Sequence, residues 1–183
     1  MLTVKLNESD RPALLAHFLA LGGEDRRLRF GFAARDVTIE RYITDIDFER
    51  DAVFGVHGDD RSFDGVTHLA LEKNHAEIGV SVLEHARGRG IGSALVSRAA
   101  VYAKNRGIEA LFMQCLSENR TTMRIALALG MKVVTQGGNS EASLSLSAAN
   151  SITPIRERAA DQIALCDAAR DMPADQARDC TRQ

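Results

Sequence analysis

The stretch VSVLEHARGRGIGSAL, residues 80–95, constrains this chain more than any other. An apolar run ends in a segment with three glycines and two arginines, and apolar residues then return with helical spacing. The order strand, glycine-rich loop, helix gathers unpaired amides and the positive end of a helix dipole at one point. Arg87 and Arg89 add charged donors there. The stretch predicts a phosphate-binding loop.

Three kinds of phosphate loop compete for this stretch. The dinucleotide fingerprint G-x-G-x-x-G fails, because counting from Gly88 puts Ser93 at the third glycine. A Walker A loop needs a Gly-Lys pair, which the sequence lacks. The third pattern, Arg/Gln-x-x-Gly-x-Gly/Ala, is matched by Arg87, Gly90 and Gly92.

With that match the chain resembles the GNAT (Gcn5-related N-acetyltransferase) superfamily, and in particular the bacterial protein-lysine-acetyltransferase type. The likeness extends over residues 76–134, through AEIGVSV, the helix after the loop, ALFMQCL, SEN and ALALGMKVV. A weaker likeness lies upstream in LGGEDRRLRFGF. The resemblance implies a GNAT fold and acetyl-CoA as the acyl donor, with the loop binding its pyrophosphate.

The resemblance also assigns roles to individual residues. Val80, Ser81 and Val82 match the splayed strand that pairs with the pantetheine arm, and the amide near Val82 matches the donor to the thioester carbonyl. Asn119 matches a side chain that contacts the cofactor, although a plain helix N-cap explains it equally well. The residues that match the pyrophosphate contacts are Arg87, Gly88, Arg89, Gly90, Ile91, Gly92 and Ser93.

Glu77 is the candidate catalytic base. Attack on a thioester needs a neutral amine, and a lysine-like amine of pKa about 10.4 is only about 1 part in 2,500 neutral at pH 7. Glu77 stands where several family members place a glutamate, although an exposed charge alternating with apolar neighbours gives the same pattern. Two positions depart from the family: Ala126 replaces the tyrosine that protonates the leaving thiolate, and Gln114 replaces a glutamate found in some members.

The order of elements predicts a mixed α/β chain of the α+β class, with a central, mostly antiparallel sheet splayed at the cofactor strand and flanked by helices. We expect a strand at 3–6, a helix at 7–21 and a connecting segment at 24–32, then a second helix at 35–46. Strands follow at 51–60 and 64–84, the latter folding back on itself. After them we expect a helix at 93–106, a strand at 109–117, a helix at 120–129 and two final strands at 131–136 and 141–148. Residues 1–150 form the acetyltransferase domain, and 151–183 form a C-terminal helical extension or tail.

Composition excludes several function classes. A net charge of -2 gives little support to nucleic-acid binding. Three cysteines without metal spacing indicate neither a disulfide framework nor zinc, so we expect no metal and a reducing, cytoplasmic location. No apolar run approaches the roughly 20 residues of a membrane span. Surface or turn positions are expected for His57, His68 and His75, and a core position for Cys115.

The expected function is an acyl-CoA-dependent N-acetyltransferase that acts on a primary amine by direct attack in a ternary complex. The acceptor is a small-molecule amine or a protein lysine, and the sequence does not choose between them. His68 or Glu72, on the strand beside Glu77, could line its pocket. The departures at Ala126 and Gln114 motivate the alternative, a non-catalytic acyl-CoA-binding regulatory or sensor module. A homodimer is a further expectation from the resemblance.

Overall fold

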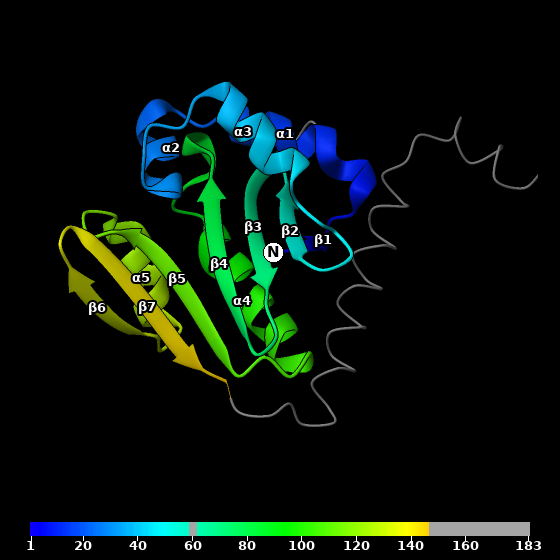
Figure 1. Ribbon diagram of the computed structural model, residues 1–183. Helices are drawn as coiled ribbons and strands as arrows, with labels where there is room; N and C mark the ends of the chain where they lie inside the picture. Colours follow the sequence, from blue (N-terminus) through cyan, green and yellow to red (C-terminus); the bar gives the residue numbers. More distant parts are fainter. Residues whose placement is uncertain (59–61, 147–183) are drawn as a thin grey trace, which may run out of the picture.

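A seven-stranded sheet is the centre of the molecule in the computed structural model, which describes residues 1–58 and 62–146. The strand order is β1-β2-β3-β4-β5-β7-β6, and every neighbouring pair is antiparallel except β4 with β5. Figure 1 shows this order across the sheet. The strands are β1 (Val4–Lys5), β2 (Ala52–His57), β3 (Phe63–Leu71), β4 (His75–Val82), β5 (Ala110–Leu116), β6 (Lys132–Gln136) and β7 (Asn139–Ser145).

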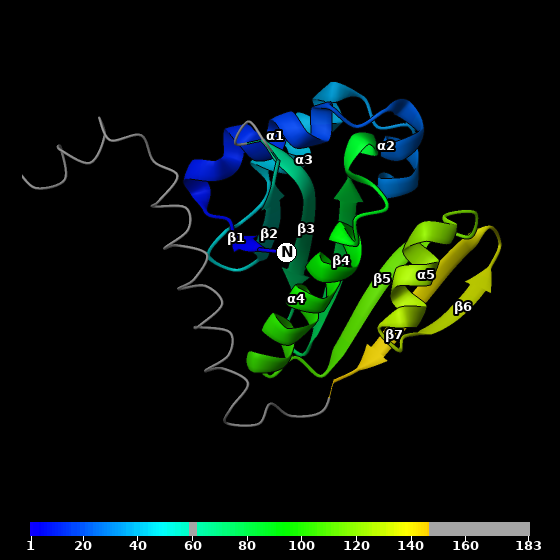
Figure 2. The ribbon, with the colours of Figure 1, turned by 180° about the vertical axis from the view of Figure 1, so that it is seen from behind.

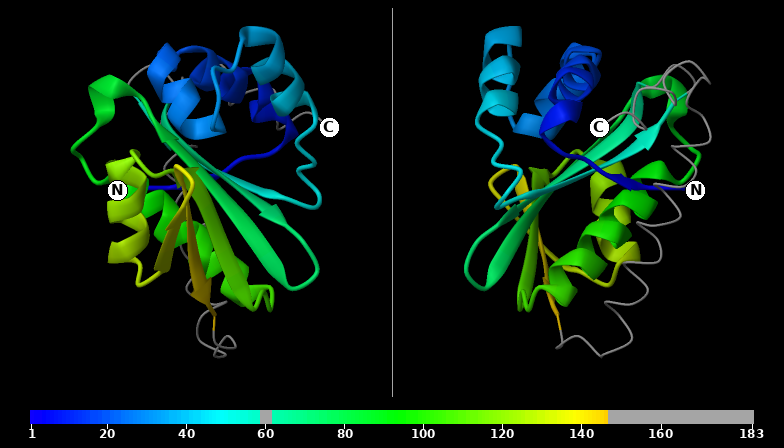
Figure 3. Two further views of the ribbon diagram at one scale, coloured as in Figure 1. Left: turned by 60° about the vertical axis from the view of Figure 1, so that its left-hand side comes forward. Right: turned by 90° about the vertical axis from the view of Figure 1, so that its right-hand side faces the viewer.

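Helices cover both faces of the sheet. The three N-terminal helices pack against one face, and α4 and α5 lie on the other, as Figure 2 and the right panel of Figure 3 show. The helices are α1 (Arg11–Leu19), α2 (Gly23–Phe30), α3 (Asp36–Thr44), α4 (Ile91–Asn105) and α5 (Arg120–Ala128), with 3-10 turns η1 (Glu8–Asp10) and η2 (Glu84–Ala86). The expected α+β class, with a mostly antiparallel sheet flanked by helices, is confirmed.

Apolar residues fill both sides of the inner strands. Val53 and Phe54 are neighbours in β2 and point to opposite faces, yet both are fully buried. Val53 belongs to the cluster under α1 and α3, with Leu14 and Ile39. Phe54 belongs to the cluster under α4, with Leu95. The short continuous apolar run of β2 therefore reflects burial on two sides.

Helix α4 begins and ends at glycines. Gly90 caps its N-terminus with φ of 81°, and Gly107 follows its C-terminus with φ of 73°. Both angles lie in the left-handed region, which glycine adopts without strain. At the next helix, Asn119 Oδ1 accepts from the Thr122 amide at 3.1 Å, so the expected N-cap of α5 is confirmed.

The prediction of a connecting segment at 24–32 was wrong, because α2 occupies most of it. Charged residues at most positions of GEDRRLRF hide the apolar stripe that would identify a helix. Its acidic residues lie in the first turn and its arginines toward the end, which complements the helix dipole. A Glu24–Arg27 ion pair of 2.8 Å adds i,i+3 support. The predicted C-terminal extension, 151–183, lies outside the described residues.

Candidate functional site

Strands β4 and β5 pair only at their beginnings. Glu77 with Phe112 is the last of the three backbone partners that join them, although β4 continues to Val82 and β5 to Leu116. Figure 1 shows the two strands diverging toward the end where α2 lies. The second half of β4 therefore has one edge without a strand partner, in the middle of the sheet.

The register of β3 and β4 decides which amides face that open edge. The Leu83 amide donates to the Asp64 carbonyl at 2.8 Å, which makes the odd-numbered residues of β4 the ones that bond with β3. The Gly79 carbonyl, which accepts from Thr67 Oγ1 at 3.1 Å, fits this register. The amides of Val80 and Val82 consequently point toward β5.

Ser81 is placed differently from its two neighbours. It is the backbone partner of Val66 in β3, and its hydroxyl donates to His17 Nε2 at 2.8 Å in α1. His17 Nδ1 in turn donates to the Phe63 carbonyl at 2.7 Å. Burial lowers the pKa of His17 to about 4, and the Phe63 bond opposes this only in part. Ser81 thus ties the strand to α1, and its side chain does not face the open edge.

The glycine loop lines a cavity of about 440 Å³ between η2, α4 and α5. Gly88 and Gly90 have φ of 76° and 81°, and a Cβ at either position would meet no atom within 4 Å. Their conformation, and not crowding, is what requires glycine. Ser93 and Ile91 also line this cavity. The Ile91 side chain itself is buried in the core under α4.

Three arginines lie near the loop, and they differ in whether they line the cavity. Arg87 lines the cavity, and its guanidinium forms an ion pair of 2.6 Å with Asp25 of α2. Arg89 does not line the cavity, and its guanidinium lies 3.3 Å from Asp64. Arg124 of α5, which the sequence analysis did not single out, lines it instead. The only feature of the sequence that could have predicted Arg124 at this cavity was its position in the helix after Asn119, on the side that faces the loop.

A second cavity of about 770 Å³ follows the open edge of β4 to Glu77. The two cavities share a set of lining residues, so they lie end to end, and these are Leu28, Arg29, Val80, Asn119 and Thr122. Asn119 caps α5 and also lines both cavities, with Nδ2 donating to the Leu28 carbonyl at 3.4 Å. The arrangement gives a continuous path from the loop to Glu77.

Glu77 is exposed and lines the larger cavity together with Gln114 and Cys115. Within the described residues, no hydrogen bond or ion pair holds the Glu77 carboxylate. The expectation that Cys115 is a core residue was wrong in part, since its half-buried side chain lies on the cavity wall. Burial raises the pKa of the Cys115 thiol, which disfavours the nucleophilic thiolate. Ala126 is buried in α5.

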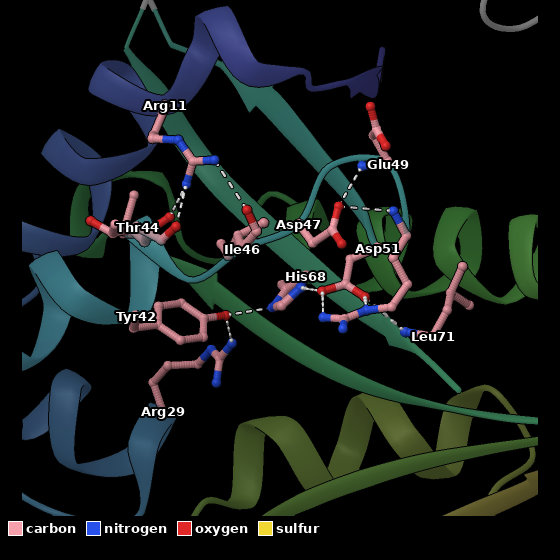
Figure 4. A network of polar contacts seen from close by, with 12 residues as sticks. Arg11, Arg29, Tyr42, Thr44, Ile46, Asp47, Glu49, Asp51, His68 and Leu71 are labelled. Carbon is pink, nitrogen blue, oxygen red and sulfur yellow. Dashed lines mark hydrogen bonds and ion pairs between the residues drawn. The ribbon is translucent and has the colours of Figure 1, made fainter. Parts of the chain in front are cut away.

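A line of hydrogen bonds enters the same cavity from the side of α2 and α3 (Figure 4). Arg29 Nη2 donates to the Tyr42 hydroxyl at 2.9 Å, and that hydroxyl lies 2.8 Å from His68 Nδ1. His68 Nε2 lies 3.1 Å from Asp51 Oδ2. Arg29, Tyr42 and His68 all line the cavity. Their side chains come from α2, α3 and β3, which is why no sequence motif joins them.

The Asp51 carboxylate is the last group of this line of hydrogen bonds. Burial opposes its ionisation, but hydrogen bonds from His68, Arg50 and the Leu71 amide outweigh burial and hold the pKa of Asp51 well below its ordinary value. Burial raises the pKa of Tyr42, while the nearby Arg29 charge lowers it in part. At neutral pH the line therefore ends in a carboxylate and begins with a guanidinium, with a protonated phenol between them.

The expected surface or turn position of His68 was wrong, since its side chain is 11% exposed and holds two partners. His57 is exposed and stacks on Phe63, and His75 pairs with Glu72 at 3.1 Å. Of the two candidates for the acceptor pocket, His68 lines the cavity and Glu72 does not. In residues 1–58 and 62–146, no cluster of three or more His, Cys, Asp or Glu is arranged to hold a metal ion.

Comparisons with known proteins agree with this geometry. The family described as "Acetyltransferase (GNAT) family" matches residues 35–131. Among curated proteins, none matches the chain. No helix in the part of the chain that the structure describes has the length and apolar character to cross a membrane.

Solved structures share the fold at low sequence identity. The GNAT domain of S. lividans PAT is 18% identical, with a TM-score of 0.67 over 79% of this chain and 89% of that one. A ribosomal-protein-alanine N-acetyltransferase from Brucella melitensis is 16% identical, with a TM-score of 0.61 over 80% and 100%. An N-acetyltransferase from Staphylococcus aureus gives the same three values of 16%, 0.61 and 80%, and is covered over 100% of its length.

Proposed function

Because the chain belongs to the acetyltransferase (GNAT) family, we propose that it is an N-acetyltransferase that moves an acetyl group from acetyl-CoA to a primary amine. The amine attacks directly, in a ternary complex. One observation carries the proposal: β4 and β5 part immediately after Glu77, so the open edge that would hold the acyl donor ends beside a carboxylate.

The described residues fit acetyl-CoA along the whole path. The amides of Val80 and Val82 face the open edge, where an extended pantetheine arm would pair as an added strand. The Val82 amide, or that of Val80, would donate to the thioester carbonyl and stabilise the charge that develops on its oxygen. The loop amides from Gly88 to Ser93 and the α4 dipole suit a pyrophosphate.

Charged side chains complete the pyrophosphate site. Arg87 and Arg124 line the cavity and would donate to the phosphate oxygens. Arg87 must exchange its Asp25 partner for the phosphate, or share it between the two. Arg89 contributes charge from outside the cavity, where Asp64 holds it.

Glu77 is the proposed base. It lies at the end of the open edge and lines the larger cavity, and within the described residues no side chain pairs with its carboxylate oxygens. A carboxylate there can take a proton from the acceptor ammonium directly or through one water. Ala126 leaves the family's usual acid position without a donor. A thiol is acidic enough to leave as thiolate and be protonated by water, so the reaction does not require that donor.

The acceptor is proposed to be a small-molecule amine or a protein lysine. The likeness to a ribosomal-protein-alanine N-acetyltransferase and to a PAT domain supports an amine acceptor without choosing between these two. The proposal also includes a cytoplasmic location and a homodimer, and it assigns no role to a metal, a nucleic acid or a membrane.

Steady-state kinetics of Glu77→Gln test the proposal. The substitution keeps the size of the side chain and removes its ability to accept a proton. We expect kcat to fall about 100-fold, while the affinity for acetyl-CoA measured by calorimetry stays within about 2-fold. An unchanged kcat would remove Glu77 from the mechanism.

A non-catalytic acyl-CoA-binding module is the alternative, favoured by Ala126 and Gln114 at positions where many relatives carry reactive side chains. It predicts that the wild-type protein binds acetyl-CoA and releases no thiol with any amine. Thiol release by the wild-type protein therefore distinguishes the enzyme from the binding module.

A further inference from the structure

Acetylation of an amine requires two protons to leave the nitrogen. The acceptor arrives as an ammonium ion, loses one proton before it attacks, and loses another after the C–N bond forms. One proton goes to the leaving sulfur as the C–S bond breaks, and the other goes to bulk water. A single carboxylate such as Glu77 can accept one proton at a time, so a second acceptor beside the nitrogen would serve the reaction.

The hydrogen-bond line from Arg29 to Asp51 has one internal direction. The Asp51 carboxylate can only accept, so neutral His68 carries its proton on Nε2 and presents Nδ1 as an acceptor. The Tyr42 hydroxyl therefore donates to Nδ1, and its oxygen accepts from Arg29. Every bond of the line then has one donor and one acceptor, and the Tyr42 oxygen keeps one lone pair.

Glu77 and His68 share one face of the sheet. His68 is the backbone partner of Gly79, which lies two residues beyond Glu77 on the same side of β4. Both side chains line the larger cavity, and so does Tyr42. Figure 4 shows the Tyr42 hydroxyl directed at His68 and Arg29, at the centre of the line.

We propose that Tyr42 is a second proton-accepting catalytic residue of the acceptor site, and that His68, positioned by Asp51, receives the proton through it. This inference rests on the proposed acetyltransferase function. The amine proton moves to the Tyr42 oxygen as the Tyr42 proton moves to His68 Nδ1, which leaves a neutral tyrosine and an imidazolium beside the Asp51 carboxylate. The imidazolium then returns its proton by the same path to bulk water.

The charges around the line favour this transfer. Arg29 lies over the Tyr42 ring, 5.6 Å from its centroid, and within the described residues it has no carboxylate partner. It stabilises negative charge on the Tyr42 oxygen during the transfer and positions that oxygen. Asp51 stabilises the imidazolium, while Arg50, 2.9 Å from Asp51, moderates it. Glu77 and Glu141 also line the cavity, and their carboxylates attract the incoming ammonium.

The pH dependence of kcat/KM for Tyr42→Phe and His68→Gln tests the inference. In the wild-type protein the rate should fall toward acid pH, because a protonated His68 has no lone pair on Nδ1 to receive the proton from Tyr42. Each variant should lose this limb of the profile and about 100-fold in kcat, and the double variant should lose little more, because the two residues act as one unit.

The control is Tyr102→Phe. Tyr102 lies on α4, against Phe54, on the opposite face of the sheet. This variant should keep both the rate and the profile. Tyr42→Phe retains the ring that packs on Phe18 and Phe30, so its melting temperature and acetyl-CoA affinity should stay close to the wild-type values.

Three results would overturn the inference. If Tyr42→Phe and His68→Gln reduce kcat and yet keep the wild-type limb, the line has only a structural role. The same conclusion follows if both variants keep the wild-type rate. If the wild-type protein releases no thiol with any amine, the proposed function fails and the inference fails with it.

Discussion

At the scale of single residues, Gly79 shows how the site depends on one missing side chain. Arg29 lies so close to Gly79 that a Cβ there would overlap its guanidinium. Arg29 lines both cavities and donates to Tyr42. The glycine therefore leaves room for the arginine that donates to Tyr42 in the larger cavity.

Gly79→Ala should damage activity far more than stability. Arg29 can swing away, because the overlapping atoms are the far end of a flexible side chain, so the free energy of unfolding should fall by about 1 kcal/mol or less. The displaced guanidinium loses its bond to Tyr42, and kcat/KM should fall about 10-fold or more. Chemical denaturation and steady-state kinetics measure the two effects.

Gly55→Ala provides the matched comparison in the neighbouring part of the sheet. A Cβ at Gly55 would come within 2.7 Å of the Phe63 ring, which is a rigid side chain buried in the core. This variant should lose about 1–3 kcal/mol of unfolding free energy and keep its kcat. Equal losses of stability in the two variants would contradict the account of Gly79.

The sequence predicts the residues of the loop and Glu77 because they lie within one short stretch of chain. Arg29, Tyr42 and Asp51 lie far from it in the sequence, and each has an ordinary structural explanation when considered alone. Their roles depend on long-range register, which pairs His68 with Gly79. Two tyrosines in the whole chain, one of them beside charged residues, were the only hint.

At the scale of elements, the loop and α4 form one unit whose two ends have glycines in the left-handed conformation. Gly90 and Gly107 sit at the two ends of α4 with φ of 81° and 73°, and a Cβ at either would meet no atom within 4 Å. Only Gly90 lines the loop cavity. Substitutions of the two glycines therefore strain the backbone equally, but only the one at Gly90 changes the loop cavity.

Gly90→Ala and Gly107→Ala should each lower the free energy of unfolding by about 1 kcal/mol, because alanine tolerates positive φ poorly. Gly90→Ala alone should weaken acetyl-CoA binding, about 10-fold, since relaxation of the loop turns its amides away from the phosphate. Calorimetric titration with acetyl-CoA measures this difference. A similar loss of affinity in Gly107→Ala would indicate that the effect comes from general destabilisation.

Most elements follow from periodicity and turn residues, and α2 is the exception. The strands β3 and β4 and the helices after the loop have strong apolar patterns, and their order was predicted correctly. Helix α2 has only two apolar side chains, Leu28 and Phe30, and both line the larger cavity, so no apolar stripe marks its packing face in the sequence. Its helical state depends on packing against β4 and β5, and this packing cannot be predicted from the residues of the helix alone.

At the scale of the whole molecule, the sheet joins two apolar clusters that lie on its opposite faces. His17 links the cluster under α1 to β4 through Ser81, and it is buried as a neutral side chain. Protonation of His17 would place an uncompensated charge between α1 and the sheet.

Stability should therefore fall as the solution becomes acidic. Burial lowers the pKa of His17 to about 4 in the folded chain, below the ordinary value near 6.5. The unfolded chain takes up a proton first, so the free energy of unfolding should decrease from pH 6.5 down to about 4, by about 3 kcal/mol in total.

Denaturation curves at several pH values measure this slope. His17→Gln can keep both hydrogen bonds without titrating, so it should flatten the curve in that window. The paired Asp51 carboxylate adds a loss only at lower pH, where carboxylates are protonated. A wild-type curve as flat as that of the variant would contradict the buried, neutral state of His17.

The central claim is that the parted strands and the glycine loop deliver an acetyl thioester to an amine beside Glu77. Free thiol release from acetyl-CoA by the wild-type protein, measured across small amines and lysine peptides together with the mass of the acceptor, tests it most directly. The account predicts thiol release only when an amine is present, with one acetyl group gained by the acceptor for each thiol released. Tight binding of acetyl-CoA without thiol release for any amine would contradict it.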